Sequence, residues 1–292
     1  MTAAPSLPAA PSPPAAGPAP EVASASTRFL DALLAADRPL VMEIKLRDPH
    51  GADLLGPRTV TDLVTRYEQA GAPCLSVVTG RWFGGTPRLL REVTATTSLP
   101  VLQKDFLTRP AQLEAAAALG ASAVLLTAAL LPAASLRRLI TAALGLGLTP
   151  FVEITEEAEL ERLTRPEACV IAVNNKDIRR RERDTGDLTR SLRLLPALRA
   201  CGTRAPVSAS AITDPADGAR LLDAGYAGLL IGTSLMRQGD VGTWTARLDA
   251  ARLDAARLDA ARLDAAGLDA ARPEAAGLDA ARLDAARRAV TA

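Results

Sequence analysis

The chain has 292 residues, of which 48% are hydrophobic, so one domain of roughly 200–250 residues can form with residues left over. Lysine and arginine total 34 against 33 aspartates and glutamates, which excludes the strong basic field typical of proteins that bind nucleic acid or an anionic membrane. We therefore expect any anionic small-molecule ligand to be bound by a local site.

The first 26 residues, MTAAPSLPAAPSPPAAGPAPEVASAS, are rich in Pro and Ala and are predicted to form a disordered extension. Prolines interrupt the segment every few residues, which disfavours a helix. The segment also lacks the positive n-region and the continuous apolar h-region of a signal peptide. We expect neither export nor a membrane span, and hence a cytoplasmic protein.

Residues 27–245 alternate short runs rich in Val, Ile and Leu with longer amphipathic stretches, as in repeated βα units. Eight such units in roughly 200 residues predict a closed (β/α)8 TIM barrel. An open doubly wound sheet usually has fewer strands and a glycine-rich first turn, which this chain lacks. The predicted strands are Leu40–Lys45, Cys74–Thr79, Pro100–Lys104, Ala123–Thr127, Pro150–Ile154, Cys169–Asn174, Pro206–Ser210 and Gly228–Ile231.

Residues 246–292 repeat the pentapeptide ARLDA, with interruptions at Gly267, Pro273 and Gly277. In a helix, leucines five residues apart advance by about 140° each time, so they form no continuous apolar stripe along which the helix could dock. Alanine content and Asp–Arg pairs three apart, such as Asp249 with Arg252, favour a loose solvated helix or disorder. A short pentapeptide-repeat β-helix is the alternative.

Three cysteines occur in the sequence, at Cys74, Cys169 and Cys201. They lie far apart beside apolar residues, without the CxxC or Cys/His spacing of a metal site. The pattern predicts reduced, buried thiols and no bound metal.

Five polar residues lie inside or at the ends of strands that are otherwise apolar. Glu43 and Lys45 are two residues apart in the first strand and therefore project to the same face. Lys104, Glu153 and Asn174 lie at or near the ends of the third, fifth and sixth strands. Each alone is explained as a structural ion pair or a solvated loop residue, but barrels build active sites at this rim. Together they predict proton-transfer chemistry.

Small residues follow the last two predicted strands, as Ser210-Ala211 and as Gly232-Thr233. Small side chains let backbone N–H groups approach an anion, and a helix N-terminus adds positive potential. Because phosphate-binding barrels bind phosphate at this position, the sequence predicts a phosphate site here. The alternative is that Gly232-Thr233 only begins a helix.

Seven segments carry a family resemblance: EIK (Glu43–Lys45), YEQAGAPCLSVVT (Tyr67–Thr79), LPVLQKDF (Leu99–Phe106), GASAVLL (Gly120–Leu126), VEI (Val152–Ile154), NNKD (Asn174–Asp177) and LIGTSLM (Leu230–Met236). In this order they resemble the indole-3-glycerol-phosphate synthase family, from about Phe29 to Arg237. The resemblance implies a barrel lyase of tryptophan biosynthesis. Such an enzyme closes the indole ring of 1-(2-carboxyphenylamino)-1-deoxyribulose 5-phosphate, releases carbon dioxide and water, and needs no cofactor.

By position, the resemblance also implies roles for individual residues. Lys104 would be the general acid at the substrate carbonyl, and Glu153 would move protons during dehydration. The remaining implied catalytic residues are Lys45 with its electrostatic partner Glu43, Asn174 at the substrate hydroxyls, and Ser210. The implied substrate-binding residues are Phe83 and Phe106 beside the anthranilate ring, Lys176, and the backbone of Ala211, Gly232 and Thr233.

The chain departs from the family pattern after its first strand. Asp48-Pro49-His50 stands where the family usually has Ser-Pro-Ser, which brings a carboxylate and the only histidine near the site. The Asp48 carboxylate would either repel a substrate carboxylate or pair with Arg47. We expect His50 to be an exposed loop residue, with a role as catalytic base as the alternative.

A second departure follows the seventh strand. Ala209-Ser210-Ala211 stands where the family usually has Glu-Ser-Gly, and an alanine in place of a glycine with positive φ costs about 1 kcal/mol or more. Lys176 stands where arginine is usual and cannot bind an anion in the bidentate arginine geometry.

These departures leave three functions open. The first is a working synthase with an altered binding site. The second is a paralogue that acts on a related phosphorylated substrate in specialised metabolism. The third is a decayed barrel that only binds. Glu43, Lys45, Lys104 and Glu153 argue against the third.

Overall fold

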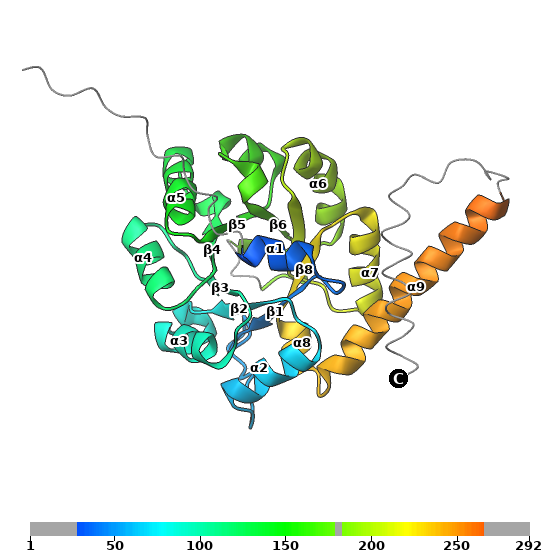
Figure 1. Cartoon of the computed structure of the whole chain (residues 1–292), viewed down its shortest axis with the longest axis horizontal. Helices are drawn as coiled ribbons and strands as arrows, with labels where there is room; N and C mark the ends of the chain where they lie inside the picture. The colour runs from blue at the N-terminus through cyan, green and yellow to red at the C-terminus, as the bar shows by residue number, and fades with distance from the viewer. Residues whose placement is uncertain (1–27, 179–182, 266–292) are drawn as a thin grey trace, which may run out of the picture.

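The computed structural model describes residues 28–178 and 183–265, so the predicted extension 1–26 and the repeats after residue 265 lie outside it. Eight parallel strands pair in chain order, and β8 pairs with β1, so the predicted barrel is confirmed (Figure 1). The strands are β1 (Leu40–Ile44), β2 (Cys74–Val78), β3 (Val101–Lys104), β4 (Ala123–Thr127), β5 (Thr149–Ile154), β6 (Val170–Asn174), β7 (Ala205–Ala209) and β8 (Gly228–Ile231).

Each strand begins and ends within one residue of its predicted bounds. The agreement has a simple cause, because every strand residue is buried. A parallel sheet covered on both faces requires nearly continuous apolar runs, and such runs are visible in the sequence.

A ring of helices covers the outside of the barrel (Figure 1). Helix α2 shows how the sequence specifies them. It begins with a capping box in which Thr59 and Asp62 exchange side-chain-to-backbone hydrogen bonds. The helices are α1 (Arg28–Leu34), α2 (Val60–Gln69), α3 (Pro87–Thr96), α4 (Pro110–Ala118), α5 (Ala133–Gly145), α6 (Thr189–Ala200), α7 (Pro215–Ala224), α8 (Thr233–Arg237) and α9 (Val241–Ala265).

The connection between β5 and β6 differs from the α-helical crossovers elsewhere in the barrel. It contains the 3-10 segments η3 (Glu157–Arg162) and η4 (Pro166–Ala168) in place of an α-helix. Pro166 lacks a backbone N–H donor, and only residues 155–169 separate the two strands, which leaves little length for a regular helix.

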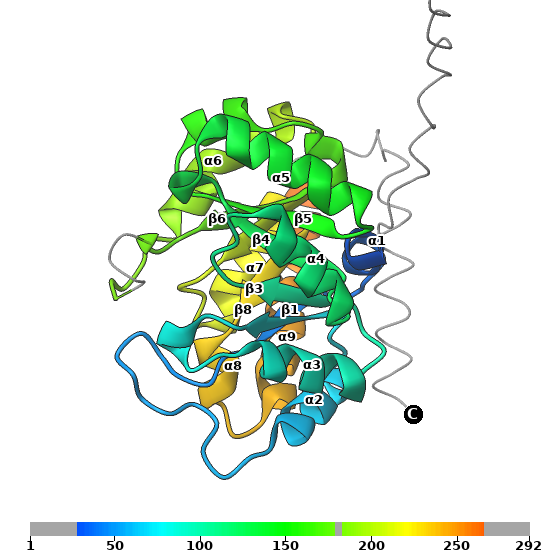
Figure 2. The same ribbon diagram turned by 90° about the vertical axis from the view of Figure 1, so that its left-hand side faces the viewer.

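The two ends of the barrel are chemically different. Helix α1 crosses one end, where Phe29 packs edge-to-face on Phe151 of β5 with ring centroids 6.2 Å apart. Phe29, Leu30 and Leu33 join the apolar core inside the barrel, so this end is closed. Figure 2 shows the loop between β1 and α2 and the connection between β6 and α6 extending from the opposite side. That opposite end carries the carboxyl termini of the strands.

One helix, α9, runs from the end of the barrel through the position 245/246 at which we expected the repeats to begin. Its first part docks on α7, because Trp244 and Leu248 are buried and Gly218 of α7 leaves room for them. A Cβ at Gly218 would lie 3.1 Å from Leu248 Cδ1. Further along, Leu258 is exposed, and the helix projects away from the barrel (Figure 1).

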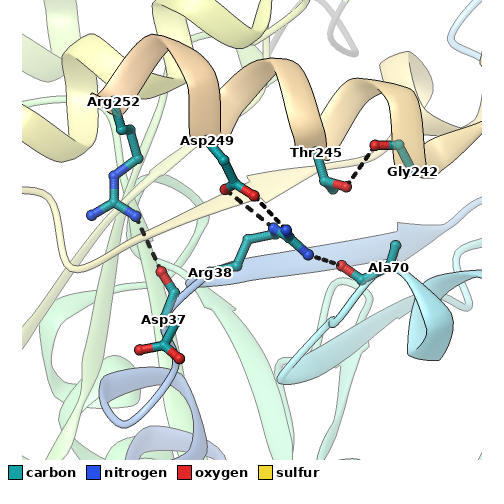
Figure 3. A network of polar contacts seen from close by, with 7 residues as sticks. All are labelled: Asp37, Arg38, Ala70, Gly242, Thr245, Asp249 and Arg252. Atoms are coloured by element: carbon teal, nitrogen blue, oxygen red, sulfur yellow. Dashed lines mark hydrogen bonds and ion pairs between the residues drawn. The ribbon is translucent and has the colours of Figure 1, made fainter. Parts of the chain in front are cut away.

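Polar contacts hold this first part of α9 against the start of β1 (Figure 3). Asp249 pairs with Arg38 through both carboxylate oxygens, and Arg38 also donates to the carbonyl of Ala70. Arg252 donates to the carbonyl of Asp37 at 3.1 Å. Further along, Asp254 and Arg257 pair with each other on the exposed surface. The contacts with the barrel thus come from the first two repeats, because each repeat advances by about 140° around the helix and later ones face away.

Two cysteines are buried and Cys201 is half-buried, and all three are free thiols. Burial raises the pKa of the Cys169 thiol to about 12 and also raises the pKa of Cys74. Neither thiol is therefore a ready nucleophile. Among the described residues, no helix is long and apolar enough to cross a membrane.

Two leucines with the same neighbours test the docking of α9. Leu248 and Leu258 both lie in the sequence RLDAA, yet the first is fully buried and the second is 60% exposed. We expect Leu248→Ala to lower the free energy of unfolding by about 2–4 kcal/mol, because it leaves a cavity against α7. Leu258→Ala should change it by less than about 0.5 kcal/mol. Equal effects in urea unfolding would show that α9 does not dock as described.

Candidate active site

Alternation along the strands places the predicted polar residues inside the barrel. Glu43, Lys104, Glu153 and Asn174 each follow an apolar residue of the inner core by two positions, so they share its face. All four are at least nine-tenths buried. The inner-core residues that precede them are Val41, Leu102, Phe151 and Ala172.

Glu43 lies between two ammonium groups. Its Oε1 is 3.4 Å from Lys45 Nζ, and its Oε2 is 3.4 Å from Lys104 Nζ. The three side chains are almost completely buried, so each charge depends on the others for the stabilisation that water would otherwise provide. The hydroxyl of Tyr67, on α2, donates to the backbone carbonyl of Glu43 at 3.1 Å and so helps to fix the strand at this residue.

Aromatic rings lie next to this charged cluster. Lys45 Nζ is 4.7 Å from the centre of the Phe83 ring, a cation–π contact. Trp82 and Phe106 pack edge-to-face with ring centroids 5.6 Å apart. The backbone N–H of Arg47 donates to the carbonyl of Phe83 at 3.0 Å, so the β1–α2 loop holds this aromatic segment in place. The structure thus places Phe83 beside Lys45 and Phe106 beside Trp82.

Trp82 was missed by the sequence reasoning. It is 60% exposed, which is unusual for so large an apolar side chain. The signal available in the sequence was a tryptophan directly beside Phe83, a residue already assigned to the site.

Several buried polar atoms of the strands have no hydrogen-bond partner among the described residues. They include Asn174 Nδ2, Ser76 Oγ and Thr127 Oγ1. The Oδ1 atom of Asn174 accepts from the backbone N–H of Lys176 at 2.9 Å, which fixes the amide and leaves its NH₂ group to donate elsewhere. Because an unsatisfied buried donor costs about 1–3 kcal/mol, a substrate hydroxyl is a natural partner for Asn174.

A cavity of about 330 Å³ opens beside the charged cluster. The predicted phosphate residues also line it, together with Lys176 and with residues after β7 and β8 that the sequence reasoning did not assign. The lining residues that concern us are Glu43, Lys45, Lys104, Lys176, Thr185, Ser210, Ala211, Thr213, Gly232, Thr233 and Arg237. The cavity therefore joins the proton-transfer cluster to the predicted phosphate site.

Lysine distribution supports the same assignment, and the sequence reasoning missed it. Of the 34 basic residues, three are lysines and the remaining 31 are arginines. All three lysines, Lys45, Lys104 and Lys176, line this one cavity.

Gly232 is required by the geometry of the site. An added Cβ would overlap Glu43 Oε1, so any side chain at this position would displace the central carboxylate. The missing side chain also leaves the backbone after β8 open to the cavity.

Ser210 and Ala211 both adopt left-handed backbone conformations, with φ of 67° and 62°. The expected strain at Ala211 is therefore present. Asn175 holds this turn, because its Nδ2 donates to the carbonyls of Ala209 at 3.0 Å and Ser210 at 3.2 Å. Ser191 Oγ donates to Asn175 Oδ1 at 2.8 Å and so completes a buried support beneath the site.

Asp48 does not pair with Arg47, as one of our alternatives held. Its carboxylate accepts the backbone N–H groups of His50 and Ala52 and the guanidinium of Arg237 at 2.7 Å. Burial alone would raise the pKa of Asp48, but these donors together hold it below its usual value. His50 is exposed and contacts Asp48 through its backbone N–H. Among the described residues no group of three His, Cys, Asp or Glu side chains could hold a metal ion.

Two neighbouring alanines test the strain at Ala211. We expect Ala211→Gly to raise the free energy of unfolding by up to about 1 kcal/mol, because glycine accepts positive φ without a Cβ penalty. Ala209 is buried in β7, so Ala209→Gly should lower it by at least about 1 kcal/mol. Thermal or urea unfolding of both variants distinguishes the two. Destabilisation by both would contradict a strained turn.

Comparisons with known proteins agree with the site. A family model described as indole-3-glycerol phosphate synthase matches residues 16–248. The indole-3-glycerol phosphate synthase of Azoarcus sp. (strain BH72) is 37% identical over 227 residues, which cover 76% of this chain and 85% of that protein. The enzyme of the same name from Carboxydothermus hydrogenoformans is 36% identical over 204 residues, 70% of this chain and 76% of that protein.

Among solved structures, 3-hexulose-6-phosphate synthase from Salmonella typhimurium aligns with a TM-score of 0.57 at 12% identity. The alignment covers 74% of this chain and 98% of that one, and it supports the barrel fold alone. The family model and the sequence relatives decide the assignment: the chain belongs to the indole-3-glycerol phosphate synthase family of lyases.

Proposed function

We propose that the protein converts 1-(2-carboxyphenylamino)-1-deoxyribulose 5-phosphate into indole-3-glycerol phosphate, carbon dioxide and water. One observation carries the proposal: Lys45 and Lys104, which both pair with the buried Glu43, line the same cavity as Lys176 and the small residues after β7 and β8. Lys45 and Lys104 can transfer protons, and the small residues with Lys176 can bind a phosphate.

Lys104 is the proposed general acid. It protonates the substrate carbonyl oxygen as the ring carbon that bears the carboxylate attacks the carbonyl carbon. The new carbon–carbon bond forms, and the carboxylate then leaves as carbon dioxide. Glu43, 3.4 Å away, holds the Lys104 ammonium in place.

Dehydration follows ring closure. The hydroxyl at the former carbonyl carbon leaves as water once it is protonated, and the neighbouring methylene carbon of the new five-membered ring loses a proton, which completes the aromatic indole. Lys45 and Glu153 are the proposed acid and base for this step, since both are buried in the barrel mouth. Asn174 is proposed to donate its unpartnered Nδ2 hydrogen to a substrate hydroxyl.

Binding residues are proposed at both ends of the substrate. The anthranilate ring packs against Phe83 and Phe106, and Trp82 extends this aromatic surface toward solvent. The phosphate accepts backbone N–H groups near Ser210, Ala211, Gly232 and Thr233, with Lys176 as a nearby cation.

A related phosphorylated substrate is the second candidate. The buried methyl group of Ala209 favours it, because the family pattern that the sequence resembles has a glutamate at this position. The test is direct: the purified protein is incubated with the carboxyphenylamino substrate, and formation of the indole product is followed by fluorescence. Product formation inhibited by inorganic phosphate supports the first candidate. Binding without turnover supports the second.

The lysines provide the sharpest test of mechanism. Lys104→Arg keeps the positive charge, but an arginine side chain does not release a proton at neutral pH. We expect kcat to fall at least about 100-fold, as for loss of a general acid. Lys176→Arg is the matched control, because only a positive charge is required there, and kcat should stay within about 3-fold. Similar activity of the two variants would remove Lys104 as the acid, and unchanged melting temperatures would show that both fold.

A further inference from the structure

The most informative contact outside the proposed chemistry is the ion pair between Asp48 and Arg237. Asp48 Oδ1 accepts from the backbone N–H groups of His50 at 2.8 Å and Ala52 at 3.0 Å. Asp48 Oδ2 accepts from Arg237 Nη2 at 2.7 Å. The Asp48 side chain is only 4% exposed, whereas the Arg237 side chain is 60% exposed. The loop thus fixes the carboxylate, and the carboxylate fixes the end of a long, exposed side chain.

Arg237 ends α8 and lines the cavity together with Lys176, Ser210 and Thr233. A guanidinium carries five N–H donors in a planar fork. The bond to Asp48 uses one nitrogen, Nη2, and within residues 28–178 and 183–265 no other hydrogen bond to this side chain is found. Arg237 therefore has donors left for a second acceptor while it stays bound to Asp48.

Other side-chain contacts also join the β1–α2 loop, residues 45–59, to neighbouring segments of the barrel. Arg58 Nη2 donates to the carbonyl of Met236 at 2.7 Å. Arg183 Nε donates to the carbonyl of Pro49 at 3.4 Å. Both contacts run to backbone carbonyls. The Asp48–Arg237 pair differs from them because it joins two charged side chains, one of which belongs to a residue that lines the cavity.

We propose that Asp48 is a positioning residue that holds Arg237 in the lining of the cavity, where the remaining guanidinium donors bind the substrate phosphate. The inference rests on the proposed function, since it assigns a further contact to the same phosphate. The opposite effect is also physically reasonable: Asp48 would compete with the phosphate for Arg237 and weaken its binding. Two features favour positioning of Arg237 by Asp48. The Asp48 carboxylate is buried and held by three hydrogen bonds, and a guanidinium can bind two anions at once through different N–H groups.

Asp48→Asn tests the sign of the effect. Asparagine keeps an oxygen for the two backbone donors but loses the charge that attracts Arg237. We expect the Kd of inorganic phosphate, measured by calorimetry, to rise by roughly 3- to 10-fold. The KM for the carboxyphenylamino substrate should rise by a similar factor while kcat stays within about 2-fold. Asp217→Asn is the matched control, since Asp217 pairs with Arg220 at 3.1 Å on the outer helix α7. It should change neither constant.

A double-mutant cycle tests whether Asp48 acts through Arg237. In an Arg237→Gln background, Asp48→Asn should no longer weaken phosphate binding, because the side chain that it positions is absent. An equal loss in both backgrounds would mean that Asp48 acts only on the loop and would overturn the proposal. So would tighter phosphate binding by Asp48→Asn, or no phosphate binding by the unaltered protein. Phosphate binding is measured without turnover, so the two proposals can fail separately. If Asp48 and Arg237 are coupled in phosphate binding but the protein does not close the indole ring, the proposed function is wrong and this inference stands.

Discussion

The arrangement of the site depends on the burial of one carboxylate between two ammonium groups. Removing a charge from water costs several kcal/mol, and the two ion pairs that Glu43 makes with Lys45 and Lys104 offset part of that cost. Neighbouring features match this requirement. Gly232 leaves the space that the Glu43 carboxylate occupies, and Tyr67 fixes the backbone of the same strand from the outside. The barrel wall is in this sense built to hold the charges in one geometry.

The chemical contrast between the barrel ends follows from strand alternation. Inside the barrel, apolar residues such as Phe151 pack on α1, and two positions further along the strand Glu153 faces the mouth. A closed apolar end keeps water away from the base of the site, while the loops at the other end admit a ligand. Proton transfer in such a setting is governed by the fixed side chains more than by solvent. This is why a cofactor-free ring closure is compatible with the arrangement.

The local sequence pattern was sufficient to predict the strands, because a buried parallel strand is apolar throughout. It also singled out Lys104 and Glu153 as candidate site residues, because charged residues are rare in such strands. The same pattern could not predict burial where identical segments lie in different surroundings. Leu248 and Leu258 share their neighbours, and only contact with α7 distinguishes them. Local sequence also could not predict the partner of Asp48, since Arg237 lies 189 residues away. Trp82 was overlooked because exposure is not a property of sequence.

Lysine and arginine have different structural roles in this protein. Arginines with buried or half-buried side chains bind carbonyl groups and join segments of backbone: Arg58 reaches Met236, and Arg190 reaches Asn174. Their planar, permanently charged groups suit such bridging. Lysines occur only where a cation faces the cavity. A chain that uses arginine at 31 of 34 basic positions has no compositional reason to place lysine there. The proton transfer proposed for Lys104 and Lys45 is a physical reason, because an arginine side chain retains its proton at neutral pH.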